Sequence, residues 1–418
     1  MRSRIAFAAL SIIFVVGAAG AGNWEQFRGP NGAGVAPKES VPAELEKHLL
    51  WKVKVPGLGN SSPVIWNDML FLQAATTDGR ERSLLCLHPK TGERIWERKF
   101  PGQPLDPKKK ITHEKNSLAS STPATDGVAV YTAIWDAKDV ILHAHTVKGE
   151  PMWEKNLGTF KSQHGPGGSP MIHRDNVYYV FDMDGVAVLH CFDKTTGKER
   201  WKMPREAFRA SYSIPQILEK GANGTELIVT STTAITSYNP ETGSQNWNWT
   251  WSWPASLKQP LRTIATSIET NGMLFACAGD GGGDRYMVAL NLPGVVGAKP
   301  AQAWDNPKEF PYVPCLLSRG DNIYFVNDRG FAGCFDAKTG KKIWYERLAE
   351  TACTASPILI GDKIYAGTEQ GDVFVLAAEP TFKVLAVNAL GERILATPAV
   401  ADGRFFVRGA SSLFCYGK

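Results

Sequence analysis

An eleven-residue pattern recurs along this 418-residue chain. It is spelled CLHPKTGERIW at residues 86–96, CFDKTTGKERW at 191–201 and CFDAKTGKKIW at 334–344. Five segments place a glycine four residues before a tryptophan: Gly92 and Trp96, Gly149 and Trp153, Gly197 and Trp201, Gly243 and Trp247, Gly340 and Trp344. A period of about 40 to 60 residues is the mark of a repeated structural unit, so the fold must be an array of similar pieces.

Each copy opens about thirty residues before its tryptophan with a small or apolar residue followed by proline. These pairs are Ser62-Pro63, Thr122-Pro123, Ser169-Pro170, Ile214-Pro215, Val313-Pro314, Ser356-Pro357 and Thr397-Pro398. Proline is tolerated at the first residue of a strand, where its missing amide donor does not break the ladder. Short apolar runs such as 322–326 and 363–366 follow, separated by Gly, Asp and Asn. Each unit is therefore predicted to hold four short antiparallel strands.

Four strands per unit predict an all-β fold, an eight-bladed β-propeller in which neighbouring blades bury each other's faces. The predicted blades begin near residues 60, 120, 168, 213, 264, 313, 355 and 396. The fifth has Thr266-Ser267 in place of proline, and the seventh lacks the Gly-to-Trp turn. The eighth lacks its last strand, which we expect residues 51–55 to supply. The N- and C-terminal strands would then pair and close the ring.

The repeated motif has a structural meaning in such a blade. Residues 338–340 are predicted to form the hairpin between the third and fourth strands, with Gly340 supplying the positive φ of a tight turn. Trp344, on the fourth strand, would then pack against the adjacent blade, where its burial is worth roughly 2 to 3 kcal/mol or more. The motif is therefore expected to be a brace that each blade needs.

These residues resemble the tryptophan-docking repeat of the pyrroloquinoline-quinone (PQQ) propellers, over about residues 48–418. The resemblance implies eight blades. It is shared by quinoprotein alcohol dehydrogenases and by non-enzymatic scaffolds such as the propeller lipoprotein of the outer-membrane β-barrel assembly machinery. Residues 24–34, WEQFRGPNGAG, also look like the lead-in of exported PQQ-like repeat proteins from bacteria. The repeat is specific for the fold and uninformative about function.

The first residues have the pattern of an export signal. A basic start, an apolar run over 5–16 and small residues at Ala19 and Ala21 predict a signal peptide over 1–21, cleaved near Ala21. Residues 22–47 form a lead-in segment and 48–418 the propeller. We expect a monomer, periplasmic or secreted, with no transmembrane segment in the mature chain. The net charge of +5 falls to +3 once Arg2 and Arg4 are removed, which argues against nucleic-acid binding.

The seven cysteines form an odd number, so they cannot all pair within one chain. Four of them occupy equivalent positions in different copies, which indicates small buried strand residues: Cys86, Cys191, Cys334 and Cys415. Cys315 and Cys353 lie near the starts of neighbouring repeats. Their pairing is the one disulfide the sequence leaves open.

Catalytic and metal-binding patterns are weak in this sequence. A quinoprotein resemblance would imply a quinone in the channel, a Ca²⁺ ion and a catalytic aspartate, but the metal-and-base set matches no motif here. The nearest candidate metal loop, residues 182–185 (DMDG), falls short of a Ca²⁺ loop. We therefore predict a non-catalytic exported scaffold for protein or glycan partners, with no metal and no cofactor. The alternative is a small quinoprotein oxidoreductase with PQQ and Ca²⁺ in the propeller channel.

The loops that lead into the blades carry basic residues at comparable positions. They are Lys115, His164, Arg209, Arg262 and Arg393, each within about ten residues of a predicted strand start. Because these loops surround one mouth of the channel, they predict a mildly cationic binding funnel there. The alternative is that they are ordinary exposed loop charges.

A run of alternating tryptophans spans residues 247–253, WNWTWSW. Side chains at period two lie on one side of a strand. Trp247 is expected to be the docking residue, while Trp249, Trp251 and Trp253 could form an aromatic platform for a glycan or a partner peptide. Alternatively, these three could pack under the insertion at 254–260.

Overall fold

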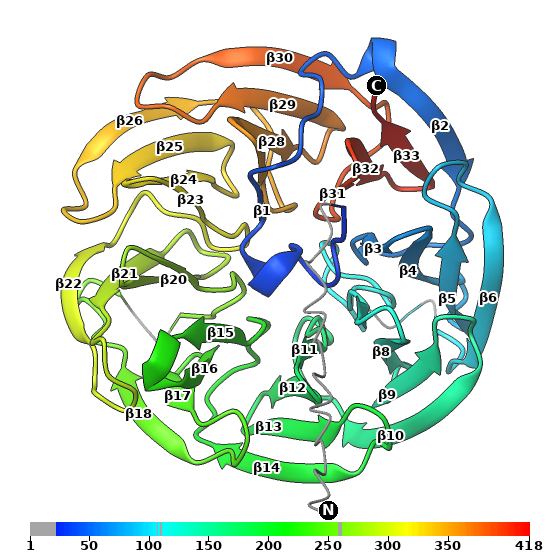
Figure 1. Ribbon diagram of the computed structural model, residues 1–418, viewed down its shortest axis with the longest axis horizontal. Coiled ribbons are helices and arrows are strands. Elements are labelled where there is room, and N and C mark those ends of the chain that lie inside the picture. Colours follow the sequence, from blue (N-terminus) through cyan, green and yellow to red (C-terminus); the bar gives the residue numbers. More distant parts are fainter. Residues whose placement is uncertain (1–21, 107, 109–110, 258–260) are drawn as a thin grey trace, which may run out of the picture.

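A computed structural model of the protein describes residues 22–106, 108, 111–257 and 261–418. The strands form eight small sheets. Figure 1 shows these sheets arranged around a central axis, with the strands of each sheet side by side in order from the axis to the rim. The predicted eight-bladed β-propeller, with four antiparallel strands per blade, is confirmed. The predicted signal peptide over 1–21 lies outside the described residues.

The blades follow one another along the chain. Their strands are β3 (Val64–Trp66), β4 (Met69–Ala75), β5 (Glu81–Leu87) and β6 (Arg94–Pro101); β7 (Ala124–Thr125), β8 (Ala129–Trp135), β9 (Asp139–Thr146) and β10 (Pro151–Thr159); β11 (Met171–His173), β12 (Asn176–Met183), β13 (Val186–Asp193) and β14 (Glu199–Arg205); β15 (Gln216–Glu219), β16 (Thr225–Thr230), β17 (Ala234–Tyr238) and β18 (Gln245–Thr250); β19 (Ile268–Thr270), β20 (Met273–Gly279), β21 (Arg285–Asn291) and β22 (Ala301–Asn306); β23 (Leu317–Arg319), β24 (Asn322–Val326), β25 (Phe331–Asp336) and β26 (Lys342–Arg347); β27 (Ile358–Ile360), β28 (Lys363–Gly367), β29 (Asp372–Ala377) and β30 (Val384–Ala389); and β31 (Ala399–Ala401), β32 (Arg404–Arg408) and β33 (Ser412–Tyr416).

Burial within a blade depends on distance from the rim. Every residue of β20 is buried, because both faces of the middle strands contact neighbouring blades, whereas β22 is mostly exposed. The middle strands therefore read as continuous apolar runs, and the rim strands carry the charged residues. This is why strand prediction from apolar runs succeeded best at the blade centres.

The ring closes through the two ends of the propeller, as the sequence predicted. Strand β2 (Leu49–Lys54) pairs antiparallel with β33 at the rim of the eighth blade, and Trp51 lies opposite Cys415. Figure 1 shows β2 beside the C-terminus. The eighth blade thus combines one N-terminal strand with three C-terminal ones.

The tryptophan brace joins consecutive blades through the glycine of the next hairpin. A Cβ atom placed on Gly340 would lie 2.6 Å from Trp304 Cε3, so the indole of one blade rests on the glycine of the following blade. The same contact pairs Trp51 with Gly92, Trp96 with Gly149, Trp153 with Gly197 and Trp201 with Gly243. The glycine is therefore required twice, for its positive φ of 70° and for the absence of a side chain.

Each docked indole also donates a hydrogen bond to a backbone carbonyl of the next blade. For Trp304 Nε1 the acceptor is Ala337 O, at 2.9 Å. Trp344 behaves alike, with Nε1 3.2 Å from Glu379 O, although its neighbour has Phe382 in place of a docking glycine. Because its N–H group is hydrogen-bonded, each indole makes both an apolar contact and a directional hydrogen bond with the next blade.

The junction between the fourth and fifth blades departs from this pattern. Trp247 Nε1 donates to Glu226 Oε1 of its own blade at 3.3 Å, and the same oxygen accepts from the amide of Gly297 in the fifth blade at 2.8 Å. Lys220 Nζ lies 3.1 Å from Glu226 Oε2, and both side chains are buried. A buried ion pair thus replaces the glycine contact where the insertion before Trp304 occurs.

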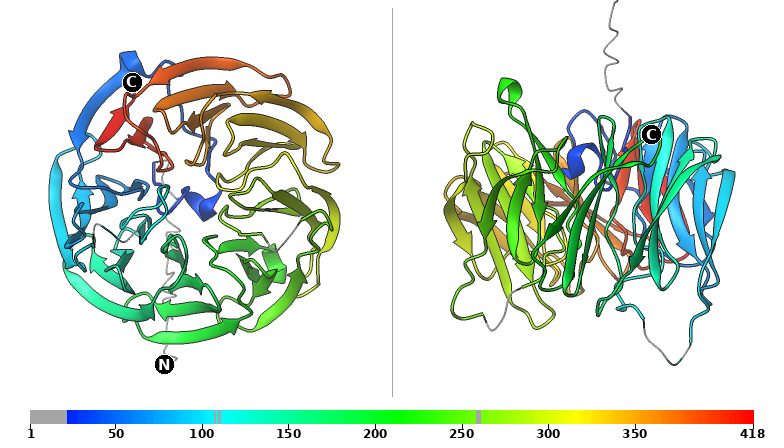
Figure 2. Two further views of the ribbon diagram at one scale, coloured as in Figure 1. Left: turned by 180° about the vertical axis from the view of Figure 1, so that it is seen from behind. Right: turned by 90° about the horizontal axis from the view of Figure 1, so that it is seen from below.

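The lead-in segment occupies the central channel. The 3₁₀ helix η1 (Pro30–Gly32) lies at the centre of the ring in Figure 1 and within the thickness of the disc in Figure 2. Strand β1 (Val35–Ala36) pairs in parallel with β27, and the Asn31 side chain bonds both the amide and the carbonyl of Ile217. Residues of the predicted lead-in thus bond to blades on both sides of the channel.

Arg28 anchors this segment from the inside. Its guanidinium is fully buried and donates to four carbonyls, including Leu316 O at 2.6 Å and Pro357 O at 3.0 Å. These two acceptors belong to the loops that lead into the sixth and seventh blades. A buried charge is tolerated there because backbone dipoles satisfy its donors.

All seven cysteines are free and buried. The disulfide that the sequence left open between Cys315 and Cys353 is not formed, and Cys315 instead accepts a hydrogen bond from the Thr266 amide at 3.2 Å. Separately, none of the helices in the described part of the chain has the length and apolar character needed to span a bilayer.

Candidate functional site

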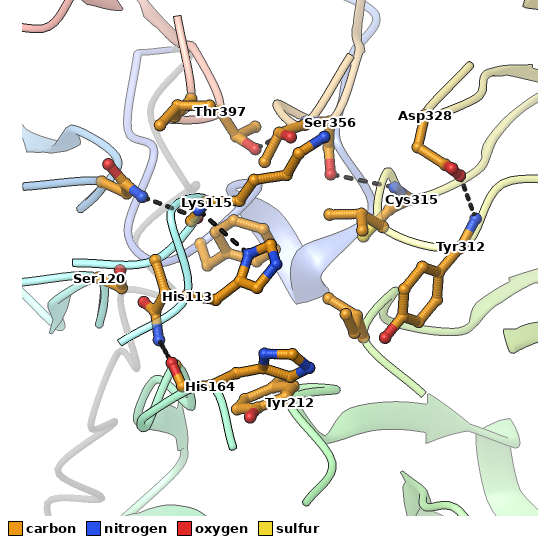
Figure 3. Close-up of a pocket in the computed structure, with 18 of the residues that line it drawn as sticks. His113, Lys115, Ser120, His164, Tyr212, Tyr312, Cys315, Asp328, Ser356 and Thr397 are labelled. Carbon is orange, nitrogen blue, oxygen red and sulfur yellow. Dashed lines mark hydrogen bonds between the residues drawn. The ribbon is translucent and has the colours of Figure 1, made fainter. Parts of the chain in front are cut away.

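A cavity of about 480 Å³ lies at the centre of the face that carries the loops between blades. We call this face the loop face and the cavity the loop-face pocket. Residues from several blades line it, and Phe27 of the lead-in segment contributes to its lining from inside the channel. In Figure 3 the side chains of His113, Lys115 and His164 lie across the cavity from Tyr312 and Asp328. The pocket is therefore bounded on the channel side by the protein's own N-terminal segment.

Hydrogen bonds between neighbouring blades form part of the inner wall of the pocket. The amide of Ser62 donates to Thr122 Oγ1 at 3.0 Å, and the amide of Thr122 donates to Ser169 Oγ at 2.9 Å. The same link recurs from Ile214 to Thr266, from Cys315 to Ser356 and from Ser356 to Thr397. At Thr122, Ser169, Ser356 and Thr397 the small residue before the proline is thus an acceptor for the preceding blade. This holds the wall rigid and positions the outer loops.

Two of the predicted basic residues, Lys115 and Arg393, meet at one carboxylate. Lys115 Nζ lies 2.8 Å from Glu369 Oε1, and Arg393 Nη2 lies 2.6 Å from Glu369 Oε2. Burial alone would raise the pKa of Glu369, but hydrogen bonds from Lys115, Thr354 and Arg393 hold that pKa below its usual value. The structure brings these two residues together with their charges largely compensated.

The other three predicted residues, Arg209, Arg262 and His164, differ from this pair in their charge balance. Arg262 is buried and bonds His164 Nε2 and, at 3.1 Å, Gln163 Oε1. His164 lines the pocket, and its pKa is lowered to about 4 by burial first and then by Arg262, His113 and Arg209. The expected cationic funnel is thus split into a compensated part and a cluster of Arg209, Arg262 and His164.

Several pocket residues escaped the sequence analysis. His113 meets His164 edge to face, with ring centroids 4.8 Å apart. Arg285 forms an ion pair with Asp328, and its guanidinium lies 5.3 Å from the ring centroid of Tyr312. Burial raises the pKa of Tyr212, which also lines the pocket, to about 12, so its hydroxyl stays protonated. These residues lie in or beside the same connecting loops as the predicted basic residues. Loop position could therefore have identified them, but the sequence pattern was applied to basic residues only.

The predicted aromatic platform is largely inaccessible. Trp249 and Trp251 are 8% and 5% exposed, and only Trp253 is half-buried. The Trp251 ring stacks on Trp253 with centroids 4.8 Å apart, and Leu257 of the following insertion packs against the same cluster. The alternative interpretation of this run, in which the side chains pack under the insertion, agrees with their burial. The physical reason is that the insertion covers the strand face that a bare blade edge would expose.

The channel offers a poor fit to a metal-dependent quinone. Within the described ranges, no group of three or more His, Cys, Asp and Glu side chains could hold a metal ion. The candidate loop at 182–185 is committed elsewhere, because the buried Asp182 is paired with Arg205 and Asp184 Oδ1 accepts from the Ala210 amide at 2.9 Å. The channel beyond the pocket is also occupied by the chain itself. The described residues therefore offer no such group of metal ligands to a Ca²⁺ ion in the channel.

The arrangement is suited to binding. Its charged side chains are mostly fixed in ion pairs, and its tyrosines, isoleucines and histidines offer flat, partly apolar walls. Such a cavity, apolar with a few fixed polar groups, is typical of a site that holds a small group or a partner's side chain.

Comparison with known proteins places the repeat in one family. The family described as "Outer membrane protein assembly factor BamB" matches residues 136–381 and 328–415. Among curated proteins, no sequence matches significantly.

Solved structures share the fold at low sequence identity. BamB from Moraxella catarrhalis is 13% identical with a TM-score of 0.63, covering 88% of this chain and 97% of its own. A quinohemoprotein alcohol dehydrogenase from Comamonas testosteroni is 12% identical with a TM-score of 0.63, over 94% of this chain and 80% of its own. Sqt1 from Saccharomyces cerevisiae is 12% identical with a TM-score of 0.63, covering 89% of this chain and 99% of its own. These similarities extend to proteins of different kinds and bear on the fold alone.

Proposed function

Since the chain belongs to the family described as outer membrane protein assembly factor BamB, we propose that it is an exported binding scaffold that receives a protein partner at the loop-face pocket. The signal-like residues 1–21 support a periplasmic or secreted location. The similarity to BamB supports a protein partner.

The observation that carries this proposal is the pocket itself. It is concave, lies at the centre of the loop face, and is bounded by rigid inter-blade hydrogen bonds on its wall and by the lead-in segment in the channel. A preformed cavity that ends within the ring is suited to receive a protruding group from outside. It favours a protein over a glycan as partner, because the tryptophans that would form a glycan platform are mostly buried.

A photo-crosslinking experiment tests the proposal. A photoreactive amino acid replaces Glu114, an exposed residue at the pocket, and in a matched variant replaces Lys338, an exposed hairpin residue of the opposite face. We expect a specific protein adduct in the producing cell from position 114 and none from position 338. Equal adducts from both positions, or none from either, would contradict the proposal.

A small quinoprotein oxidoreductase is the second candidate, favoured by the fold similarity to the quinohemoprotein alcohol dehydrogenase. It requires that the lead-in segment and the pocket accommodate PQQ together with a Ca²⁺ ion, for which the described residues offer no group of three or more His, Cys, Asp and Glu side chains. Thermal unfolding with PQQ and Ca²⁺, followed by a dye-reduction assay on alcohols and sugars, decides between the two. Stabilisation together with turnover would replace the scaffold proposal by this one.

A further inference from the structure

We propose that residues 112–117 form a strap that gates the loop-face pocket. The strap is closed while Lys115 is paired with Glu369, and it opens when this ion pair breaks and the segment moves aside. This inference rests on the proposed role of the pocket, and it names how access to that pocket is controlled.

The strap belongs to the connection between the first and second blades. This connection covers residues 102–123 and is longer than the connections between the other blades. Residues 113–116 line the cavity in succession, and Figure 3 shows the side chains of His113 and Lys115 at the cavity. A shift of this one segment would therefore change the width of the pocket.

Neighbouring side chains of the strap hold parts of the ring that are far apart. Asn116 Nδ2 donates to His164 O at 2.7 Å and to Pro166 O at 3.0 Å, both in the loop between the second and third blades. Lys115 Nζ lies 2.8 Å from Oε1 of Glu369, which belongs to the hairpin between β28 and β29 of the seventh blade. In a ring of eight blades these two positions are nearly opposite. The strap therefore lies between them, where it obstructs the pocket.

Apolar contacts fix the strap at its two ends and leave its middle to polar contacts. Ile111 and Leu118, one on each side of it, pack against the core shared by the second and third blades. Each residue from 112 to 117 is at least partly exposed. A hydrogen bond from Asn60 Nδ2 to Lys115 O, at 3.0 Å, is typical of its contacts. Segments with few buried apolar contacts open at low free-energy cost while the surrounding fold stays intact, so this segment can move between two fixed points.

The ion pair is arranged so that Lys115 can leave without stranding its partner. Glu369 also accepts hydrogen bonds from Arg393 Nη2 and Thr354 Oγ1, each at 2.6 Å. Because the Glu369 side chain is only 11% exposed, a carboxylate without any cation would be costly there, and Arg393 keeps it paired. Lys115 is 31% exposed and becomes hydrated once it is released. A partly exposed pair of this kind contributes little net stability, so the closed state is easily left.

Hydrogen exchange of the full-length mature protein tests the latch without any partner. We expect the backbone amides of residues 112–117 to exchange about two- to fivefold faster in Lys115→Met than in the natural protein, the range that a partly exposed ion pair contributes. Lys90→Met, which removes an exposed ion pair with Asp68 on the opposite face, is the control and should leave these amides unchanged.

A second variant keeps this test decisive if Lys115→Met fails to fold. Asn116→Ala releases the strap from the loop between the second and third blades and should also speed the exchange of its amides. Natural exchange rates in both variants would overturn the latch.

Photo-crosslinking measures whether the strap controls access. A photoreactive amino acid at Val313, which lines the pocket outside the strap, reports a group that has entered the cavity. We expect Lys115→Met to raise the yield of the protein adduct from position 313 by a factor similar to that in exchange, because apparent affinity rises with the fraction of open molecules. Lys90→Met should leave this yield unchanged. An equal or lower yield in Lys115→Met would show that the strap is a fixed wall and would overturn the gate.

The two measurements separate this inference from the scaffold proposal. Faster strap exchange in Lys115→Met, with no adduct from position 114 or position 313, supports the gate and overturns the protein partner. A specific adduct from position 114 together with natural strap exchange in the variants supports the partner and overturns the gate.

Discussion

The two edges of the fourth blade join their neighbours in different ways. At one edge the indole of Trp201 lies on Gly243 and donates to Pro240 O at 3.2 Å, so apolar contact and one neutral hydrogen bond make the link. At the other edge Trp247 is bonded to the buried carboxylate of Glu226, which is held by Lys220 and the Gly297 amide. The first junction is copied around the ring. The second junction has a buried ion pair in place of the contact between indole and glycine. Its stability therefore depends on every hydrogen-bonding and charged partner of Glu226 being present.

The largest expected effect comes from removing the buried charge. Glu226→Gln leaves Lys220 without its counter-ion and should lower the free energy of unfolding by about 3 to 5 kcal/mol, measured by urea denaturation. Glu350→Gln, whose side chain is 85% exposed, is the control and should change it by less than about 1 kcal/mol. The double variant Lys220→Met with Glu226→Gln should recover much of the loss. If Glu226→Gln behaves like the control, the two junctions do not differ as described.

A smaller loss is expected from filling the docking position at the copied junction. Gly243→Ala forces a Cβ to within 2.6 Å of Trp201 Cε3 at a φ of 73°, and should cost about 2 to 4 kcal/mol. Gly272→Ala is a matched control with the same φ and no atom within 4 Å of the added carbon. The difference in melting temperature between the variants measures the tryptophan contact alone. Equal losses would show that the glycine is needed only for its backbone conformation.

The smallest effect separates the two indole hydrogen bonds. Trp201→Phe removes a donor to a neutral carbonyl, about 0.5 to 1.5 kcal/mol, and Trp247→Phe removes a donor to a buried carboxylate, about 1.5 to 3 kcal/mol. Both variants lose similar ring area, so the difference between their urea unfolding free energies reports the charge. A larger loss for Trp201→Phe would reverse the assignment of the two junctions.

The repeat made the fold predictable because its determinants are local. A glycine four residues before a tryptophan, and a proline before most first strands, specify hairpins within one blade. Ring closure through residues 51–55 was also predictable, since a tryptophan strand without a preceding blade must join one that lacks it. In contrast, Arg28 binds carbonyls of Leu316 and Pro357, about 290 and 330 residues away, and no periodicity announces such contacts.

The candidate site was predictable only in part. The positions of basic residues in the loops between blades pointed to Lys115 and His164, which line the pocket. The sequence did not show that Glu369 would neutralise Lys115 and Arg393. Blades that are separate in the chain meet at the channel, so the pairing of loop charges depends on blade geometry. For the tryptophan run the sequence left two alternatives, an exposed platform and packing under the insertion, because contacts such as that of Leu257 with this cluster depend on tertiary packing.

The pairing of β2 with β33 has a consequence for how the protein is made. Trp51 finds its partner Cys415 only when nearly the whole chain is available. Until β2 and β33 pair, the seven other blades therefore form an open arc. Closure is a single long-range step that should limit the folding rate, and the open arc is the form most exposed to aggregation and proteolysis.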